Sequence, residues 1–266
     1  MQNASVERTD IIKAEHITLR RGREALLNDL SWKVSRGEHW AVLGVNGAGK
    51  TLLMKILTGY IWPTKGTVEI LGQTLGRVDL RVLRRSLGWV AKALEELTPP
   101  RTTVLEVILS GPEASLGLYT EPTTRQIRQA EELAEEYGLT RLIRREFGLL
   151  SSGEKQRALL ARAAAHHPAI LFLDEPMANL DMAGREQFMA MLEKLAAGPT
   201  APAVVLTTHN TLEIGPFMTH ALLLKNGAEV ASGPLDQTMR PEILKAAFDL
   251  PLQVERTASG RYLAYL

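Results

Sequence analysis

GVNGAGKT, residues 44–51, is a glycine-rich stretch that fits the pattern G-x-x-x-x-G-K-[ST], with one further glycine at position 47. Gly44, Gly47 and Gly49 carry no Cβ, so the backbone can fold around a phosphate and direct successive N–H groups at it. Lys50 follows at once and can reach β- and γ-phosphates, while Thr51 offers a hydroxyl to Mg²⁺. The stretch therefore predicts a nucleotide-binding loop.

The segments on either side of this loop fit a strand–loop–helix unit. Residues 40–43 are a short apolar run suited to a buried parallel strand, and residues 52–57 are good helix formers. A helix that begins here adds its N-terminal dipole to the anion site. A plain glycine-rich turn is the alternative, but strand, loop, Lys-Thr pair and helix occur in the order that phosphate binding requires.

Composition and length place modest bounds on the chain. It has 266 residues, 45% of them hydrophobic, which is enough for a sizeable core. The net charge of +1 creates no strong field, so no nucleic-acid partner is predicted. The absence of cysteine excludes thiolate metal sites and suits the cytoplasm. No apolar run approaches about 18 residues, and residues 1–10 are too polar for a signal peptide. We expect a soluble chain that serves a membrane only through partners.

Alternating apolar runs and turns predict an α/β fold. Further strands are expected at 11–19, 26–34, 67–71, 87–91, 169–173 and 204–207. Helices are expected at 80–86, 103–109, 124–137, 152–166 and 241–248. Pro99-Pro100 and Pro168 bound a nearly all-helical segment, which we interpret as an insertion between strands of one sheet. Asn226-Gly227 between two apolar runs predicts a hairpin with a type I′ turn.

The apolar strand at 169–173 runs into Asp174-Glu175-Pro176. Carboxylates at the end of a buried strand can hold the metal of a phosphoryl-transfer site. Asp174 can bind Mg²⁺ directly or through water, and Glu175 can polarise the attacking water. A solvated and idle strand end is the alternative. The phosphate loop in the same chain favours the metal site.

Ser151-Ser152-Gly153-Glu154 marks the start of a helix, because Ser151 and Glu154 have the spacing of a capping box. Hydroxyls and a glycine at a helix start also make an anion-binding N-terminus. A plain structural cap remains the alternative. If an anion binds here, the position within the helical insertion suggests a second site, or the same site in a second subunit.

Residues 150–157, LSSGEKQR, resemble the signature motif, usually written LSGGQ, of the ATP-binding-cassette (ABC) ATPases. Residues 178–181 resemble the D-loop of that family, and His209, after the strand at 204–207, resembles its switch histidine. With the phosphate loop and Asp174-Glu175, five motifs occur in the order of the family, between about residues 11 and 239.

The resemblance implies an α/β fold with a P-loop NTPase (RecA-like) core, an antiparallel β subdomain and an inserted α-helical subdomain. The whole chain, 1–266, is then a single ABC-type ATPase domain. Its core comprises 11–91 and 169–240, its helical subdomain 99–167, and its C-terminal appendage 241–266. Parts of that appendage resemble tails on cassettes of chelate-importer type, with a short packing appendage as the alternative.

The resemblance also implies a homodimer, or paired cassettes, in which two ATP molecules lie between the phosphate loop of one copy and the signature helix of the other. Ser151 and the Gly153 N–H then meet the γ-phosphate across the interface. The implied site residues are Gly44, Val45, Asn46, Gly47, Ala48, Gly49, Lys50, Thr51, Leu52 and Arg21 for ATP, Ser151, Ser152, Gly153 and Glu154 for the ATP of the opposing copy, Asp181 for the D-loop, Thr51 and Asp174 for Mg²⁺, and Glu175 and His209 for catalysis.

The function that this resemblance implies is the ATP-hydrolysing subunit of a transporter, peripheral on the cytoplasmic face of the membrane beneath integral membrane subunits. A soluble ABC ATPase acting in regulation or on macromolecules is the alternative. Lys92 and the segment 108–119 resemble such a soluble-like branch, associated in name with molybdate transport. An ATP-binding scaffold that barely hydrolyses ATP is disfavoured by Glu175 and His209.

Three positions depart from the family pattern. Leu52 replaces a Ser or Thr near the α-phosphate, and Arg21 stands where an aromatic residue usually stacks on adenine. Lys92 occupies the Q-loop position, where the glutamine of the family contacts Mg²⁺ and membrane subunits dock. An ammonium group has no acceptor for Mg²⁺. We expect Lys92 to turn away from the ion; pairing with the γ-phosphate and a merely solvated loop residue are the alternatives.

Overall fold

The structure is a computed structural model that describes residues 9–198 and 200–266, so most of the polar start expected at 1–10 lies outside the described residues. The strands are β1 (Asp10–Arg21), β2 (Glu24–Ser35), β3 (Trp40–Leu43), β4 (Lys65–Ile70), β5 (Gln73–Thr74), β6 (Leu87–Ala91), β7 (Ile170–Asp174), β8 (Ala203–Thr208), β9 (His220–Lys225), β10 (Ala228–Pro234), β11 (Gln253–Arg256) and β12 (Tyr262–Tyr265).

The helices alternate with these strands. They are α1 (Lys50–Leu57), α2 (Leu80–Arg84), α3 (Lys92–Leu97), α4 (Val104–Leu109), α5 (Thr124–Glu136), α6 (Ser152–Ala164), α7 (Met182–Leu195), α8 (Leu235–Thr238) and α9 (Pro241–Phe248), with 3-10 turns η1 (Thr140–Leu142), η2 (Phe147–Leu149) and η3 (Thr211–Glu213). Within the described residues, none of these helices is long and apolar enough to cross a bilayer.

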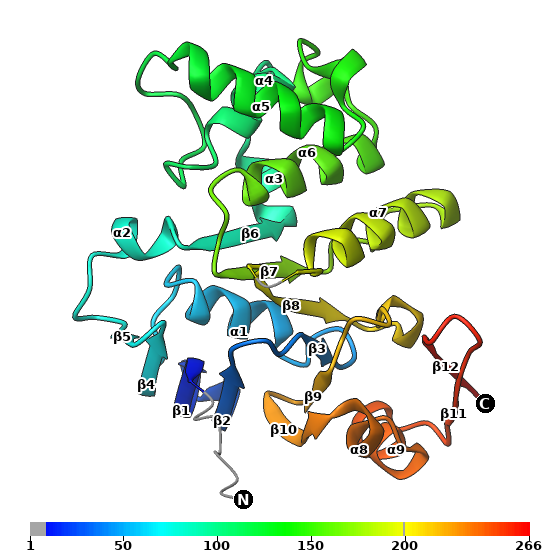
Figure 1. Cartoon of the computed structure of the whole chain (residues 1–266). Coiled ribbons are helices and arrows are strands. Elements are labelled where there is room, and N and C mark those ends of the chain that lie inside the picture. Colours follow the sequence, from blue (N-terminus) through cyan, green and yellow to red (C-terminus); the bar gives the residue numbers. More distant parts are fainter. Residues whose placement is uncertain (1–8, 199) are drawn as a thin grey trace, which may run out of the picture.

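A six-stranded sheet with the order β10-β9-β3-β8-β7-β6 forms the centre of the molecule (Figure 1). Strands β9, β3, β8, β7 and β6 run parallel, and β10 pairs antiparallel at the edge. Every residue of β3, β6, β7 and β8 is buried, which explains why these strands read as continuous apolar runs. Because the strands are parallel, their carboxyl ends meet at one edge of the sheet.

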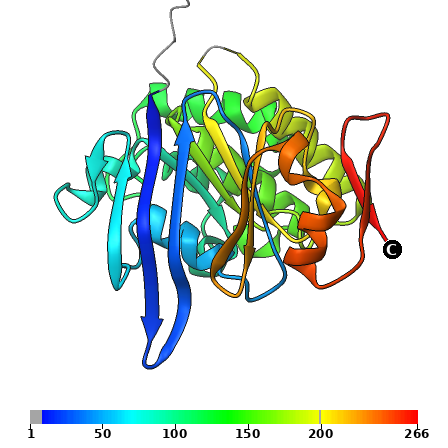
Figure 2. The same ribbon diagram turned by 90° about the horizontal axis from the view of Figure 1, so that it is seen from below.

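A second sheet, antiparallel with the order β2-β1-β4-β5, lies to one side of the first. Figure 2, a view from below, shows its long strands β1 and β2 side by side. Strand β2 alternates between buried residues, among them Leu30, Trp32 and Val34, and exposed ones, as expected for a sheet with one covered face. Helix α1 contacts both β2 and β7, so it packs between the two sheets.

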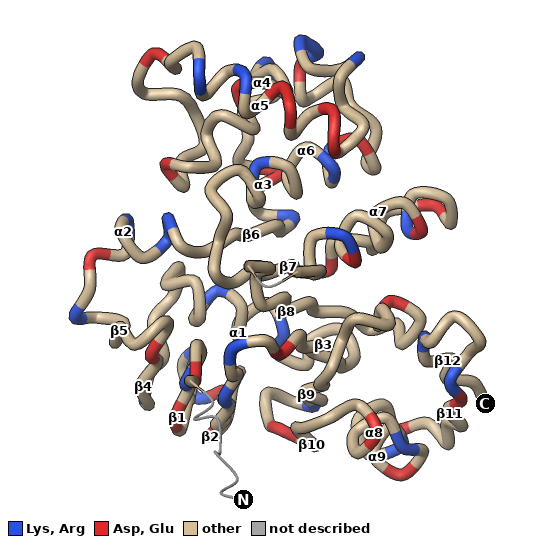
Figure 3. Tube along the Cα trace, in the orientation of Figure 1, with Lys and Arg blue, Asp and Glu red and all other residues tan. Residues whose placement is uncertain are grey.

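Helices α3 to α6 form a separate layer beyond β6 (Figure 1). Helices α4, α5 and α6 each begin with a capping box, formed by Thr103 with Glu106, Thr123 with Gln126, and Ser151 with Glu154. Basic and acidic residues are interspersed along this layer and the rest of the chain (Figure 3).

The strands and helices expected from the sequence are present, with small differences at their ends, and β6 and α9 have the expected bounds. The type I′ turn is also confirmed, since Asn226 has φ 49° and Gly227 has φ 74°. Helices α3 and α7 and the β11–β12 hairpin were not predicted. The hairpin depends on long-range contacts: Arg261 donates to both carboxylate oxygens of Glu186 on α7, at 2.6 and 2.8 Å.

We predict that Phe172→Ala lowers the free energy of unfolding by about 3–5 kcal/mol, because it opens a cavity in a close-packed interior. Phe172 is fully buried in β7, between β6 and β8. Urea denaturation measures the change. The control is Tyr119→Ala, whose side chain is 86% exposed and should cost less than about 0.5 kcal/mol. Similar losses in both variants would contradict this account of the core.

Candidate nucleotide-binding site

The glycine-rich loop joins the end of β3 to the start of α1, and close packing requires two of its three glycines, Gly44 and Gly49. A Cβ on Gly44 would lie 2.4 Å from the carbonyl oxygen of Leu224. A Cβ on Gly49 would lie 2.6 Å from Cδ2 of Leu27, and Gly49 caps α1 with φ 103°, in the left-handed region. The backbone can therefore curl tightly at the positive end of the α1 dipole, which suits a phosphate group.

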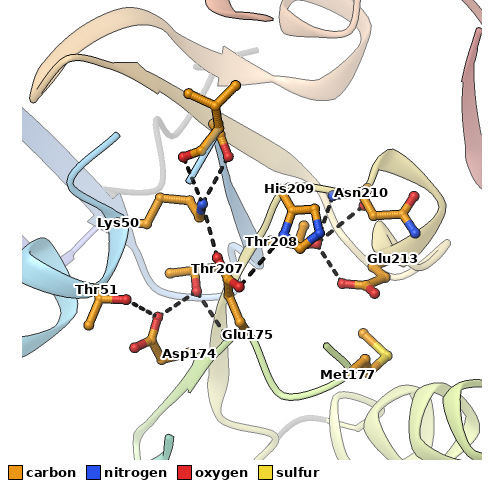
Figure 4. Close-up of polar contacts among 12 residues, drawn as sticks. Lys50, Thr51, Asp174, Glu175, Met177, Thr207, Thr208, His209, Asn210 and Glu213 are labelled. Atoms are coloured by element: carbon orange, nitrogen blue, oxygen red, sulfur yellow. Dashed lines mark hydrogen bonds and ion pairs between the residues drawn. The ribbon is translucent and has the colours of Figure 1, made fainter. Parts of the chain in front are cut away.

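Lys50 is the first residue of α1 and is almost fully buried, with 4% of its surface exposed. Its Nζ donates to the carbonyl oxygens of Gly44 at 2.8 Å and Val45 at 3.2 Å, inside the loop. The same Nζ lies 3.0 Å from Oε1 of Glu175, which follows β7 (Figure 4). The loop and the end of β7 thus converge on one ammonium group.

Asp174 is the last residue of β7 and is buried. Its Oδ1 accepts hydrogen bonds from the hydroxyls of Thr51 at 3.0 Å and Thr207 at 2.7 Å. Burial raises the pKa of Asp174 above its usual value, and these two hydroxyls act in the opposite direction. A divalent cation beside Asp174 would likewise favour the ionised carboxylate.

The described residues contain no group of three or more His, Asp or Glu side chains that could hold a metal ion. A cation at this place would therefore rest on Asp174 and the hydroxyl of Thr51, completed by oxygens from nucleotide and water. Mg²⁺ is commonly bound in this way, through one or two carboxylates together with substrate phosphates. The residues present fit Mg²⁺ as a companion of bound nucleotide.

Glu175 has φ 48°, a left-handed conformation that is costly for a non-glycine residue and that clusters at functional sites. Its Oε2 lies 3.6 Å from Nδ1 of His209, which is too far for a direct hydrogen bond. His209 follows β8, so the parallel sheet brings both predicted catalytic residues to one edge (Figure 4).

Two cavities separate the predicted site residues into two groups. A cavity of about 430 Å³ is lined by Thr51, Lys92, Asp174 and Glu175, among others. Another of about 390 Å³ is lined by Ser151, Ser152, Gly153 and Asp181, among others. Residues 151–154 do not line the first cavity. The structure brings the phosphate loop and the metal-site candidates together, and it places the signature residues apart from them.

The capping box predicted at Ser151 is confirmed, and a second helix cap, at Asp181, was not predicted. The N–H of Ser151 donates to the Glu154 carboxylate at 2.7 Å, and this bond holds the pKa of Glu154 below its usual value. Asp181 caps α7 by accepting a hydrogen bond from Gly184 N at 2.7 Å. These residues stabilise helix starts, and a role toward the ATP of another copy stays a prediction.

Lys92 does not lie in a loop, as its Q-loop position had suggested, but opens α3. Lys-Ala-Leu-Glu-Glu-Leu is a run of strong helix formers, which explains the helix at this place. The side chain of Lys92 is 74% exposed, and its Nζ lies 3.7 Å from Oε1 of Glu96, one turn along the helix. Glu95 instead faces α6, where it pairs with Lys155 at 3.3 Å.

The remaining predicted ATP contacts are distributed around the loop. Val45 and Asn46 are exposed, Ala48 is buried against the core, and Leu52 lies half-buried in the first turn of α1. Arg21 ends β1 in the exposed β1–β2 turn. Stacking of Arg21 on adenine stays a prediction.

Sequence reasoning missed two threonines, Thr207 and Thr208, at the carboxyl end of β8. Thr207 donates to Asp174, and Thr208 donates to the buried carboxylate of Glu213 (Figure 4). The available signal was a pair of hydroxyl residues at the end of the apolar strand β8. Buried hydroxyls need hydrogen-bond partners, and the partners here are carboxylates.

Comparison with known proteins agrees with this geometry. The profile of the ABC transporter family matches residues 27–178. The chain belongs to this family. The ABC transporter ATP-binding protein YlmA of Bacillus subtilis, itself uncharacterised, is 39% identical over 92% of this chain and 93% of its own length. The cobalt import ATP-binding protein CbiO of Rhodobacter capsulatus is 37% identical over 85% of this chain and 79% of its own.

Solved structures of ABC cassettes have the same fold. A transporter described as of metal-chelate type, in an inward-facing conformation, matches with a TM-score of 0.79 and 26% identity over 97% of this chain and 98% of its own. A dimeric cassette in a post-hydrolysis state with ADP and Pi matches with a TM-score of 0.74 and 26% identity over 84% and 98% of the two chains. The protein is an ATP-binding and ATP-hydrolysing subunit of ABC-transporter type, with a P-loop NTPase core and antiparallel β and helical subdomains.

We predict that Lys50→Ala severely weakens ATP binding, because the loop loses the buried ammonium group that bonds to Gly44 and Val45. Charge-assisted contacts of this kind contribute about 1.5–3 kcal/mol each, so affinity should fall by at least about tenfold. Isothermal titration calorimetry measures the change, with exposed Lys65→Ala on β4 as control. Unchanged affinity in Lys50→Ala would refute the site assignment.

For Lys92, we predict that Lys92→Gln raises Mg²⁺-dependent ATP turnover several-fold, because an amide oxygen can serve a metal site where an ammonium group cannot. Steady-state ATPase activity across a Mg²⁺ titration checks this. Lys92→Met removes the charge without adding an oxygen and should leave the curve near that of the wild type. Superimposable curves for all three proteins would deny Lys92 any part in the metal site.

Proposed function

We propose that two copies of this chain pair head to tail around two ATP molecules and that hydrolysis in the pair drives separate membrane subunits. The observation that carries this proposal is the separation of the two anion-binding elements. Thr51, the last residue of the phosphate loop, lines one cavity with Asp174 and Glu175, and Ser151 with Gly153 lines another. A second copy supplies the missing half of each site. The dimeric cassette with ADP and Pi supports such an arrangement.

In this proposal the whole chain, 1–266, is one ABC-type ATPase domain. The core comprises 11–91 and 169–240, the helical subdomain 99–167, and the C-terminal appendage 241–266. The α3–α6 layer carries the signature residues, and the β11–β12 hairpin belongs to the appendage.

We assign a different role in ATP hydrolysis to each of several groups of this chain. The loop N–H groups and Lys50 hold the phosphates, and the carboxylate of Glu175 accepts a proton from the attacking water. His209, from the end of β8, faces the same carboxylate and orients the reacting groups. Mg²⁺, held by Thr51 and Asp174 when bound, neutralises charge that develops on the phosphates.

Lys50 already donates to two carbonyl oxygens and pairs with Glu175. An ammonium group has three donors, so at least one partner must yield when a phosphate binds. Glu175 is the partner with a mobile side chain, since the two others are backbone carbonyls. Phosphate binding at Lys50 therefore releases the carboxylate of Glu175 for its role as base.

Our proposal of a membrane partner and of a cytoplasmic location is based on the names of similar proteins. Their names include the ATP-binding protein of a manganese transport system and a cobalt import ATP-binding protein. We place this chain at the cytoplasmic face, bound to integral membrane subunits. The alternative, a soluble ABC ATPase, is favoured by Lys92 at the position of the family glutamine. Copurification from native membranes separates them: a transporter subunit brings down an integral membrane protein, and a soluble enzyme does not.

We predict that Glu175→Gln keeps ATP binding and lowers hydrolysis by at least about 100-fold, because an amide cannot accept the proton of the water. The variant should then accumulate as an ATP-bound dimer. Size-exclusion chromatography with multi-angle light scattering, run with and without ATP, measures this. A monomer under all conditions would contradict the head-to-tail pair.

Ser151→Arg in the Glu175→Gln background provides the matched control. The arginine side chain is larger than that of serine and positively charged, and it would occupy the cavity lined by Ser151 and Gly153. It should abolish the dimer while leaving nucleotide binding by each monomer intact. If the double variant still dimerises with ATP, the signature residues do not face the ATP of the other copy.

A further inference from the structure

Thr207 is a buried hydroxyl residue whose place in the sheet brings it next to both carboxylates of the site. In the parallel register of β7 and β8, Thr207 pairs with Asp174. Thr207 is fully buried, as are Val204, Val205 and Leu206 before it on the strand. A valine at this place would preserve the apolar character of β8. The hydroxyl is thus a polar group within the core and must find partners there.

The hydroxyl of Thr207 joins two successive residues of the site. It donates its one proton to Oδ1 of Asp174 at 2.7 Å, and its oxygen accepts a hydrogen bond from the backbone N–H of Glu175 at 2.9 Å. The carbonyl oxygen of Thr207 also accepts from this N–H, at 3.2 Å. A single threonine therefore fixes the side chain of Asp174 and the peptide of Glu175 together (Figure 4).

The bond to Asp174 determines which carboxylate oxygen stays available. Thr51 and Thr207 both donate to Oδ1. Across residues 9–198 and 200–266, no hydrogen bond ends on Oδ2 of Asp174. With Oδ1 engaged twice, the rotation of the carboxylate is set, and Oδ2 is left to a cation or its water. Outer partners of this kind orient metal-holding carboxylates.

The bond to Glu175 acts on its backbone. Glu175 has φ 48°, a conformation that persists only when its surroundings hold it. The two acceptors offered by Thr207 anchor its N–H, and from this peptide the side chain reaches both Lys50 and His209. Without the hydroxyl, the N–H of Glu175 keeps one acceptor, the carbonyl oxygen of Thr207. Glu175 can then still adopt its left-handed conformation, but fewer contacts hold it there.

From these contacts we infer that Thr207 is a positioning residue of the ATPase site, which orients Asp174 toward Mg²⁺ and holds Glu175 in its left-handed conformation. This inference rests on the proposed roles of Asp174 and Glu175. Thr207 touches neither nucleotide nor metal in this scheme and acts through the two carboxylate residues.

Three variants isolate the hydroxyl of Thr207. Thr207→Val removes it and keeps the shape of the side chain, whereas Thr207→Ser keeps it. Thr238→Val removes a comparably buried hydroxyl in α8, which donates to the carbonyl oxygen of Pro234 at 3.0 Å and lies outside the site. Thr207→Ala removes the hydroxyl as well and replaces the valine variant if that variant does not fold.

The first readout is metal affinity without turnover. Mn²⁺ is titrated into protein saturated with a non-hydrolysable ATP analogue, and free Mn²⁺ is followed by electron paramagnetic resonance. Outer partners contribute about 10- to 100-fold to metal affinity or activity. The dissociation constant of Mn²⁺ should rise about tenfold or more in Thr207→Val and stay near the wild-type value in Thr207→Ser and Thr238→Val.

The second readout is steady-state hydrolysis. In Thr207→Val kcat should fall by about 10- to 100-fold, with little change in KM for ATP, because Lys50 and the loop are untouched. Unchanged Mn²⁺ affinity and unchanged kcat in this variant would overturn the inference, and so would equal losses in Thr207→Ser. Failure of the wild type to bind ATP or to hydrolyse it with Mg²⁺ would refute the proposed function itself, before any variant is compared.

Discussion

The site depends on the parallel register of β3, β8 and β7, because this register decides which side chains meet at the carboxyl edge of the sheet. Thr207 pairs with Val42 on one side and with Asp174 on the other. The phosphate loop leaves β3 one residue later, and His209 leaves β8 at the same edge. A shift of one residue in β7 would turn Asp174 to the opposite face of the sheet, and the same shift in β8 would turn Thr207 away.

Charge burial explains the internal bonding of the site. Lys50 and Asp174 are both buried, and an isolated buried charge is costly. Lys50 is compensated by two carbonyl oxygens and Glu175, and Asp174 by two hydroxyls. The charged groups of Lys50 and Asp174 thus already have polar partners within the protein. These partners can yield to ligand oxygens, so binding exchanges one set of contacts for another and does not create a new buried charge.

The helical layer carries the second set of groups that we propose bind an anion, apart from the phosphate loop. Capping boxes begin α4, α5 and α6, and the one at Ser151 faces its own cavity. Within that layer, Glu95 on the unpredicted helix α3 is bonded to Lys155 and Gln156 on α6. The link runs from the segment after β6 to the signature helix.

The sequence by itself determined the features that local chemistry controls. Glycine spacing at 44–49, apolar runs with the length of buried strands, capping boxes and the Asn226-Gly227 turn predicted most elements and the main site residues, because each rests on neighbours within a few positions. Tertiary structure alone decided which distant groups meet. The hydroxyl of Thr207 on β8 meets Asp174 on the neighbouring strand β7, Glu95 on α3 meets Lys155 on α6, and the C-terminal hairpin forms where Arg261 reaches Glu186. Such contacts depend on register and packing over the whole chain, which no local pattern specifies.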